Sequence, residues 1–185
     1  MAKEIGKRLT KLRGKKSREE VAKAVGVSVS AISMYENGEI YLQSLSSMFP
    51  VVVLEPKEDE NILDMAAAPG GKTTQIVAMS NGKSLVTACE KNKIRCDRLR
   101  YNLDKQGAAG VNVLMQDARS LDNYFSFDKI LLDAPCSGSG TLDLSDVNLE
   151  KRISKELVEK KKKTQFELLK KAITILKSGH EMIYS

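Results

Sequence analysis

The chain has 185 residues, 42% of them hydrophobic, which suffices for one core of ordinary domain size with a smaller unit attached. Lysine and arginine number 30 against 24 acidic residues, giving a formal net charge of +6 at pH 7. No stretch approaches the length of a membrane span, and the start MAKEIGKRL has no apolar signal segment. These features predict a soluble, cytoplasmic protein without membrane contact.

The three cysteines, Cys89, Cys96 and Cys136, are odd in number and show no CxxC spacing. They therefore indicate neither a disulfide framework nor a zinc site, and no metal is predicted. Positive charge is concentrated at the front, where residues 1–40 hold nine basic and five acidic side chains. A basic segment favours contact with nucleic acid, because neutralised phosphates release counterions; a solvated lysine-rich surface is the alternative.

Residues 1–40 predict three short helices. Ile5, Leu9 and Leu12 have the spacing of one helical face. Ser17, followed by Glu20, predicts a capping box that opens a second helix with apolar side chains at 21, 24 and 25 and a stop at Gly26. A tight turn then precedes a third helix from about residue 28 to 36, ended by Asn-Gly. This is the pattern of a helix-turn-helix.

The stretch REEVAKAVGVSVSAISMYENG resembles the bacteriophage-repressor (Cro/cI-like) DNA-binding family. The resemblance implies that Val29, Ser30 and Ser33 face the major groove and that Arg18 lies near a phosphate. Two further helices usually close the core of such repressors, whereas here the pattern stops near Ile40. We therefore expect only weak, mostly electrostatic DNA contact from this partial segment.

From residue 41 onward, strands alternate with helices, which predicts a parallel sheet covered by helices on both faces. We expect an α/β fold with a Rossmann-like sheet, incomplete at its C-terminal end, in a domain spanning 41–185, preceded by an all-α segment at 1–40. The expected strands are NILDMA, SLVTACE, VNVLMQD, KILLDAP and EMIYS, and the expected helices are KTTQIVAMS, residues 91–106 and residues 149–176, the last capped by Ser178-Gly179.

The loop AAAPGGKT follows the first of these strands and indicates a nucleotide site. It satisfies a loose phosphate-loop pattern, which would make the chain an NTPase, but Pro69 has no N–H to offer a phosphate. S-adenosylmethionine instead needs a small-residue loop, an acid for the ribose and a polar residue for adenine at successive strand ends. Asp64 with its loop, Glu90 and Asp117 occupy these positions, although each acid alone could be a helix cap.

The motifs LDMAAAPGGKT, ACEKNKIRCDRLRYNLDKQG, DAR and DAPCSGSGT resemble, in this order, the NOL1/NOP2/Sun family of RNA cytosine-5 methyltransferases, over about residues 41–185. YLQSLSSMFPVVVLEP resembles the family's lead-in. The resemblance implies an rRNA or tRNA substrate and S-adenosylmethionine as cofactor. The implied cofactor-binding residues are Ala67, Ala68, Pro69, Gly70, Gly71, Lys72, Glu90, Arg95, Asp117 and Asp133.

In this family one cysteine, in a Thr-Cys-Ser motif, attacks C6 of the base, and a second, in Asp-Ala-Pro-Cys, assists release of the product. The resemblance gives Cys136 the second role and makes Asp133 the carboxyl group that supports N3. The matching attacker would follow Ser185, so we expect this chain to be inactive or weakly active, as in a chimera or recombined fragment joined near residue 40. DNA cytosine-5 methyltransferases attack from an equivalent Pro-Cys loop, which leaves the attacking role open for Cys136.

Other residues have ordinary structural interpretations. Cys89 and Cys96 match neither catalytic cysteine and are expected to be small packed residues, and His180 is expected to be structural. The lysines of KELVEKKKKTQ predict a solvated helix face, with contact to an RNA backbone as the alternative. Two other functions stay open: a DNA-binding regulator whose α/β domain is a sensor or scaffold, and an NTPase.

Overall fold

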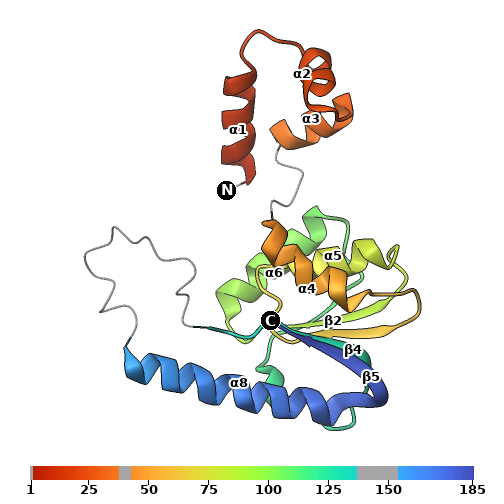
Figure 1. Cartoon of the computed structure of the whole chain (residues 1–185), viewed down its shortest axis with the longest axis vertical. Helices are drawn as coiled ribbons and strands as arrows, with labels where there is room; N and C mark the ends of the chain where they lie inside the picture. Colours follow the sequence, from red (N-terminus) through yellow and green to blue (C-terminus); the bar gives the residue numbers. More distant parts are fainter. Residues whose placement is uncertain (1, 38–42, 137–153) are drawn as a thin grey trace.

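The computed structural model describes residues 2–37, 43–136 and 154–185. Within this part of the chain, five strands form one parallel sheet in the order β3-β2-β1-β4-β5 (Figure 1). The α/β fold class predicted from the sequence is confirmed. The strands are β1 (Asn61–Asp64), β2 (Leu85–Cys89), β3 (Asn112–Leu114), β4 (Phe127–Leu132) and β5 (Leu176–Tyr184).

Helices cover both faces of the sheet, because successive side chains of each buried strand point to opposite sides. On one face, Leu63 of β1 and Ile130 of β4 share a core with apolar residues of α8. On the other, Ile62 and Leu131 pack against α4 and α5 (Figure 1). The covering elements are α4 (Leu45–Leu54), α5 (Gly71–Met79), α6 (Lys93–Lys105), the short 3-10 helix η1 (Ala118–Ser120) and α8 (Lys155–Ile175).

Helix α4 was not predicted from the sequence, since Pro50 lies inside it and removes one intrahelical donor. Ser44 caps its start by accepting the Ser47 N–H at 3.3 Å. At its other end the buried Lys129 of β4 donates to the Leu54 and Glu55 carbonyls, both at 2.7 Å. These tertiary contacts, together with burial of apolar side chains against the sheet, stabilise a helix that the local sequence disfavours.

The structure corrects the expected end of the last helix. Helix α8 ends at Ile175, and Leu176 already pairs with Phe127 as the first residue of β5. The predicted cap at Ser178-Gly179 is therefore wrong: both residues lie in an irregular stretch of the ladder, where Gly179 adopts φ +76°. Residues 149–153, the predicted start of this helix, lie outside the described residues.

Three further helices precede the sheet: α1 (Ala2–Arg13), α2 (Arg18–Val25) and α3 (Val29–Asn37). The capping box of Ser17 with Glu20 and the left-handed Gly26 are present as predicted. The expected apolar faces are only partly present: Leu9 is 37% and Leu12 is 83% exposed, whereas Val21 is partly buried. On α2 the buried residue is Ala22, whereas positions 24 and 25 are exposed.

The backbones of α1 and α3 approach each other closely, which explains why a small residue is buried between them. A Cβ on the buried Gly6 of α1 would stand 2.1 Å from the carbonyl oxygen of Glu36, so only glycine lets α1 pack this tightly on α3. The Glu36 carboxylate accepts hydrogen bonds from both Arg13 and Arg18, which ties the three helices together. No helix among the described residues is long and apolar enough to cross a bilayer.

Candidate functional site

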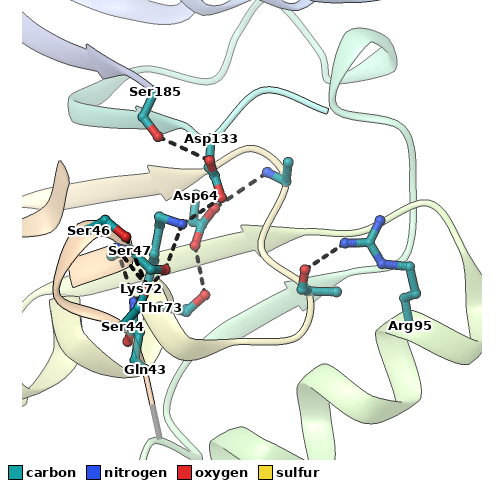
Figure 2. Close-up of polar contacts among 12 residues, drawn as sticks. Gln43, Ser44, Ser46, Ser47, Asp64, Lys72, Thr73, Arg95, Asp133 and Ser185 are labelled. Atoms are coloured by element: carbon teal, nitrogen blue, oxygen red, sulfur yellow. Dashed lines mark hydrogen bonds and ion pairs between the residues drawn. The ribbon is translucent and has the colours of Figure 1, made fainter. Parts of the chain in front are cut away.

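The order of the strands reverses between β1 and β4, and ligands of open α/β sheets bind at the carboxyl ends of such strands. Asp64 ends β1 and Asp133 follows β4 at this point. A cavity of about 220 Å³ opens there (Figure 2 shows its polar side chains). Its lining consists of Gln43, Ser44, Ser47, Asp64, Ala66, Ala67, Ala68, Pro69, Gly71, Lys72 and Asp133.

The loop between β1 and α5 borders this cavity with small side chains. Gly70 caps α5 at φ +110°, and a Cβ there would stand 2.9 Å from Leu99 Cδ1, so the turn requires glycine. Two side chains of α6 hold the loop: Arg95 Nη2 donates to the Ala68 carbonyl and Asn102 Nδ2 to the Pro69 carbonyl, each at 2.6 Å. A ligand can therefore approach the backbone of a well-supported loop.

An ion pair spans the cavity. Lys72 Nζ at the start of α5 lies 2.7 Å from Asp133 Oδ2 and 3.2 Å from the hydroxyl of Ser47 (Figure 2). The other oxygen of Asp133 accepts a hydrogen bond from Ser185 Oγ at 3.0 Å. The site thus presents one cation and one anion to a ligand, with hydroxyl groups beside them.

Asp64 lines the same cavity as this ion pair and is buried. It accepts a hydrogen bond from Thr73 Oγ1 at 2.8 Å and a longer one from the Ala66 N–H at 3.4 Å. Burial raises the pKa of Asp64 to about 6, and the neighbouring Asp133 acts in the same direction, while the two hydrogen bonds and Lys72 oppose the shift. This carboxyl group consequently titrates near pH 6.

Glu90 stands at the end of β2, beside the loop. It is buried, accepts the Asn92 N–H at 2.8 Å, and lies 3.5 Å from Arg95, which in turn binds the loop carbonyl of Ala68. Arg95 therefore joins the second strand end to the loop of the first. Glu90 lies beyond the lining of the cavity, at the neighbouring strand end.

Asp117 follows β3 and caps η1. Arg119 binds both of its oxygens, with Nε at 3.0 Å and Nη2 at 2.6 Å, and also reaches Glu167 of α8. The hydrogen bonds from Arg119 lower the pKa of Asp117 to about 2. The carboxylate stays ionised at neutral pH, and its oxygens are engaged by Arg119, a partner that was not predicted from the sequence. Asp117 and Arg119 line a second, more open pocket of about 490 Å³.

The three cysteines occupy different environments. Cys136 is exposed and follows Pro135, whose carbonyl accepts a hydrogen bond from Gln165 Nε2 of α8 at 3.3 Å. Cys89 and Cys96 are buried in the core, and burial raises the pKa of the Cys89 thiol to about 12. Among the three, only Cys136 is accessible to a substrate.

Sequence reasoning missed the contribution of α4. Gln43, Ser44 and Ser47 line the cavity, and Gln43 Nε2 donates to the Ser47 hydroxyl at 3.0 Å (Figure 2). The signal available was Ser44, since serine is favoured at the N-cap of a helix. The segment was recognised as a family lead-in without being given a role in the site.

The predicted DNA-contacting residues lie on α2 and α3, and none of them lines the cavity. Val29 and Ser30 are exposed at the start of α3, and Ser33 is partly buried. Arg18 is ion-paired with Glu36, with Nε 2.7 Å from Oε2. The structure therefore gives Arg18 a partner within the helical segment.

A parallel sheet with this loop and these strand-end acids defines a Rossmann-like methyltransferase domain. The chain belongs to the family described as 16S rRNA methyltransferase RsmB/F, whose model matches residues 51–185. This family depends on S-adenosylmethionine. A helix-turn-helix family model matches residues 7–47.

Individual relatives agree with this assignment. A tRNA (cytosine(72)-C(5))-methyltransferase of Pyrococcus horikoshii is 40% identical over 159 residues, which cover 85% of this chain and 40% of the relative. The 25S rRNA (cytosine-C(5))-methyltransferase nop2 of Schizosaccharomyces pombe is 34% identical over 165 residues, which cover 86% of this chain and 27% of the relative. The chain thus spans less than half the length of these relatives.

Solved structures share the fold. NSun6 from Pyrococcus horikoshii, crystallised with SFG, superposes with a TM-score of 0.72 at 37% identity, covering 85% of this chain and 40% of that one. A methyltransferase homologue from the same organism gives a TM-score of 0.71 at 29% identity, covering 92% of this chain and 60% of that one.

Proposed function

We propose that residues 41–185 form the S-adenosylmethionine-binding domain of an RNA cytosine-C5 methyltransferase. The observation that carries the proposal is the cavity at the reversal of strand order, where the loop after β1 meets Lys72 and Asp133. Two relatives, 34% and 40% identical, are named as cytosine-C5 methyltransferases of rRNA and tRNA, and one similar structure contains SFG, an S-adenosylmethionine analogue. The substrate of this chain is accordingly an RNA.

The residues present fit the cofactor. Ala66, Ala67 and Ala68 line the cavity with small side chains, and Gly70 lets the loop turn close to Leu99 of α6. Glu90 uses one oxygen for the Asn92 N–H, so its carboxylate keeps acceptor capacity for ribose hydroxyls. We assign cofactor binding to Ala67, Ala68, Pro69, Gly70, Gly71, Lys72, Glu90, Arg95, Asp117 and Asp133.

The bound cofactor would supply the methyl group, and the chain's own residues would hold the base. In this chemistry a thiolate adds to C6 so that C5 becomes nucleophilic, and the C5 proton is lost when the thiolate leaves. We propose that Asp133 faces N3 of the cytosine and that Cys136 assists release of the methylated product. The exposure of Cys136, three residues after Asp133, supports this assignment.

Titration calorimetry tests the proposal and separates it from an NTPase. We expect binding of S-adenosylmethionine and of its demethylated product, and none of ATP, because Pro69 interrupts the amides that a phosphate loop would need. Binding of ATP alone would favour the NTPase instead. Absence of binding by either methylation ligand at millimolar concentration would refute the assignment of the cavity.

A second candidate function is nucleic-acid contact by the separate domain that we propose for residues 1–40. The match of a helix-turn-helix family to residues 7–47 favours it. We expect weak binding of duplex DNA that falls steeply with salt and is similar for all sequences, since α3 begins with the short side chains of Val29 and Ser30. Tight, sequence-selective binding at physiological salt would instead identify a DNA-binding regulator.

A further inference from the structure

The outward face of α8 carries an unusual combination of side chains. Lys162, Lys163, Phe166 and Lys170 recur at the three- and four-residue spacing of one helix side, and we call them the α8 stripe. The opposite side, with Leu168, Ala172 and Ile175, is packed on the sheet. Phe166 is 57% exposed and the Lys162 side chain 76% exposed. The stripe therefore presents an aromatic ring among cations to the solvent.

Charge within the stripe is only slightly compensated. Lys162 lies 3.8 Å from Glu159, an exposed pair one turn away, and such pairs contribute little. Lys170 Nζ stands 4.6 Å from the centre of the Phe166 ring, so this lysine and the ring form one surface. Exposed lysines alone are typical of a solvated helix face; this stripe differs in that an aromatic ring lies among its lysines and contacts one of them.

The stripe is also placed next to the proposed catalytic loop. Gln165, adjacent to Phe166, donates a hydrogen bond to the Pro135 carbonyl, and the exposed Cys136 follows. At its other end Lys170 borders the open pocket that contains Asp117 and Arg119. The stripe thus runs between the proposed catalytic loop and the pocket beside Asp117.

We propose that the α8 stripe binds single-stranded RNA next to the target cytosine, with its lysines on phosphates and one base stacked on Phe166. The inference rests on the proposed function, because it takes its ligand from the proposed reaction. A cytosine must leave any duplex to reach C5 chemistry, so the flanking nucleotides are unpaired. Cations alternating with an aromatic ring suit such a strand, since phosphates and base faces are both available there.

Fluorescence anisotropy of a labelled, unstructured RNA about 12 nucleotides long tests the inference on the full chain over a range of salt. The double variant Lys162→Gln/Lys163→Gln should reduce the slope of log affinity against log salt by about 1.4, since each single-strand phosphate contact contributes about 0.7. Phe166→Leu should weaken binding roughly fivefold or more without changing this slope. Gln and Leu both favour helices, so α8 is retained.

Matched controls lie elsewhere on the surface. Lys57→Gln/Lys105→Gln removes the same charge from exposed positions, and Phe49→Leu changes an exposed ring on α4. Equal effects of the control variants, an unchanged salt slope in the α8 variant, or absence of RNA binding would overturn the inference. Titration of the same proteins with S-adenosylmethionine separates the two proposals. If the cofactor binds but the α8 variants bind RNA as tightly as the unmodified chain, only the RNA surface is refuted. If the unmodified chain does not bind the cofactor, the proposed function is refuted.

Discussion

Lys72 on α5 and Asp133 after β4 form an ion pair, with Nζ 2.7 Å from Oδ2, between the ends of two neighbouring strands. The side chain of Lys72 is 15% exposed and that of Asp133 is 40% exposed, so the pair is only partly shielded from solvent. Because Ser47 of α4 also contacts this lysine, the pair connects three elements around the cavity. It fixes the charge pattern that a ligand meets.

We predict that Lys72→Met weakens S-adenosylmethionine binding by about tenfold or more, because a charge-assisted hydrogen bond at the site is worth about 1.5–3 kcal/mol. Calorimetry at constant salt measures the change. Lys83→Met is the matched control, since Lys83 pairs with Glu58 at 2.8 Å on the exposed surface. Unchanged affinity in Lys72→Met, in a protein that still folds, would limit this lysine to a structural role.

Glu90→Ala provides an independent test at the next strand end. We expect cofactor binding to weaken by about 1–3 kcal/mol, because buried hydrogen bonds to ribose hydroxyls would be lost. Calorimetry gives the affinity, and a thermal melt of the variant checks that the fold survives. A variant that folds and binds like the unmodified chain would remove Glu90 from the site.

The strand-end acids could be predicted because parallel strands bring their carboxyl ends to one edge of the sheet, whatever the details of packing. Asp64 and Asp133 meet at the cavity for this reason. Arg119 binds Asp117 from only two residues away, a local contact that the sequence analysis overlooked. The contact of Arg119 with Glu167 depends on how α8 packs on η1 across 48 positions of sequence, and spacing alone does not predict it.

The role of α4 was hidden for a different reason. Pro50 disfavours the helix locally, while Lys129, far along the chain, stabilises its end through two carbonyls. Since the helix itself was not predicted, Ser44 and Ser47 could not be placed at the cavity. On the first helix, periodicity predicted the element but not its buried side, because packing there depends on the small Gly6.

Gly70→Ala should destabilise the fold by about 2–4 kcal/mol, since it adds backbone strain at φ +110° to a clash with the buried Leu99. Gly82→Ala is the matched control: it has φ +70° but open space around the new Cβ, so strain alone should cost about 1–2 kcal/mol. Urea denaturation of both variants gives the comparison. Equal losses would mean that Leu99 moves aside without penalty.

The pH dependence of stability should reveal Asp64. Burial raises its pKa from the ordinary 3.8 to about 6, so between these values the folded protein binds a proton that the unfolded chain does not. Stability from this group is therefore gained as pH falls from about 6 toward 4, and lost as pH rises. Relative to Asp64→Asn, the unmodified chain should gain about 2–3 kcal/mol in free energy of unfolding between pH 7 and pH 4. A constant difference between the two proteins in urea denaturation at both pH values would contradict the raised pKa.

Alkylation tests the different environments of the three cysteines. The thiolate is the reactive form, so exposure and a low pKa both accelerate modification. Cys89 and Cys96 are fully buried, and burial raises the pKa of Cys89 to about 12, whereas Cys136 is exposed.

We expect iodoacetamide to modify Cys136 alone in the native protein, as located by mass spectrometry of its peptides. Cys136→Ala should abolish native labelling, while urea should make Cys89 and Cys96 reactive in the same variant. Rapid native labelling of Cys89 or Cys96 would show that the core opens beside the sheet, and a Cys136 that resists modification would remove the accessibility on which its proposed part in the reaction depends.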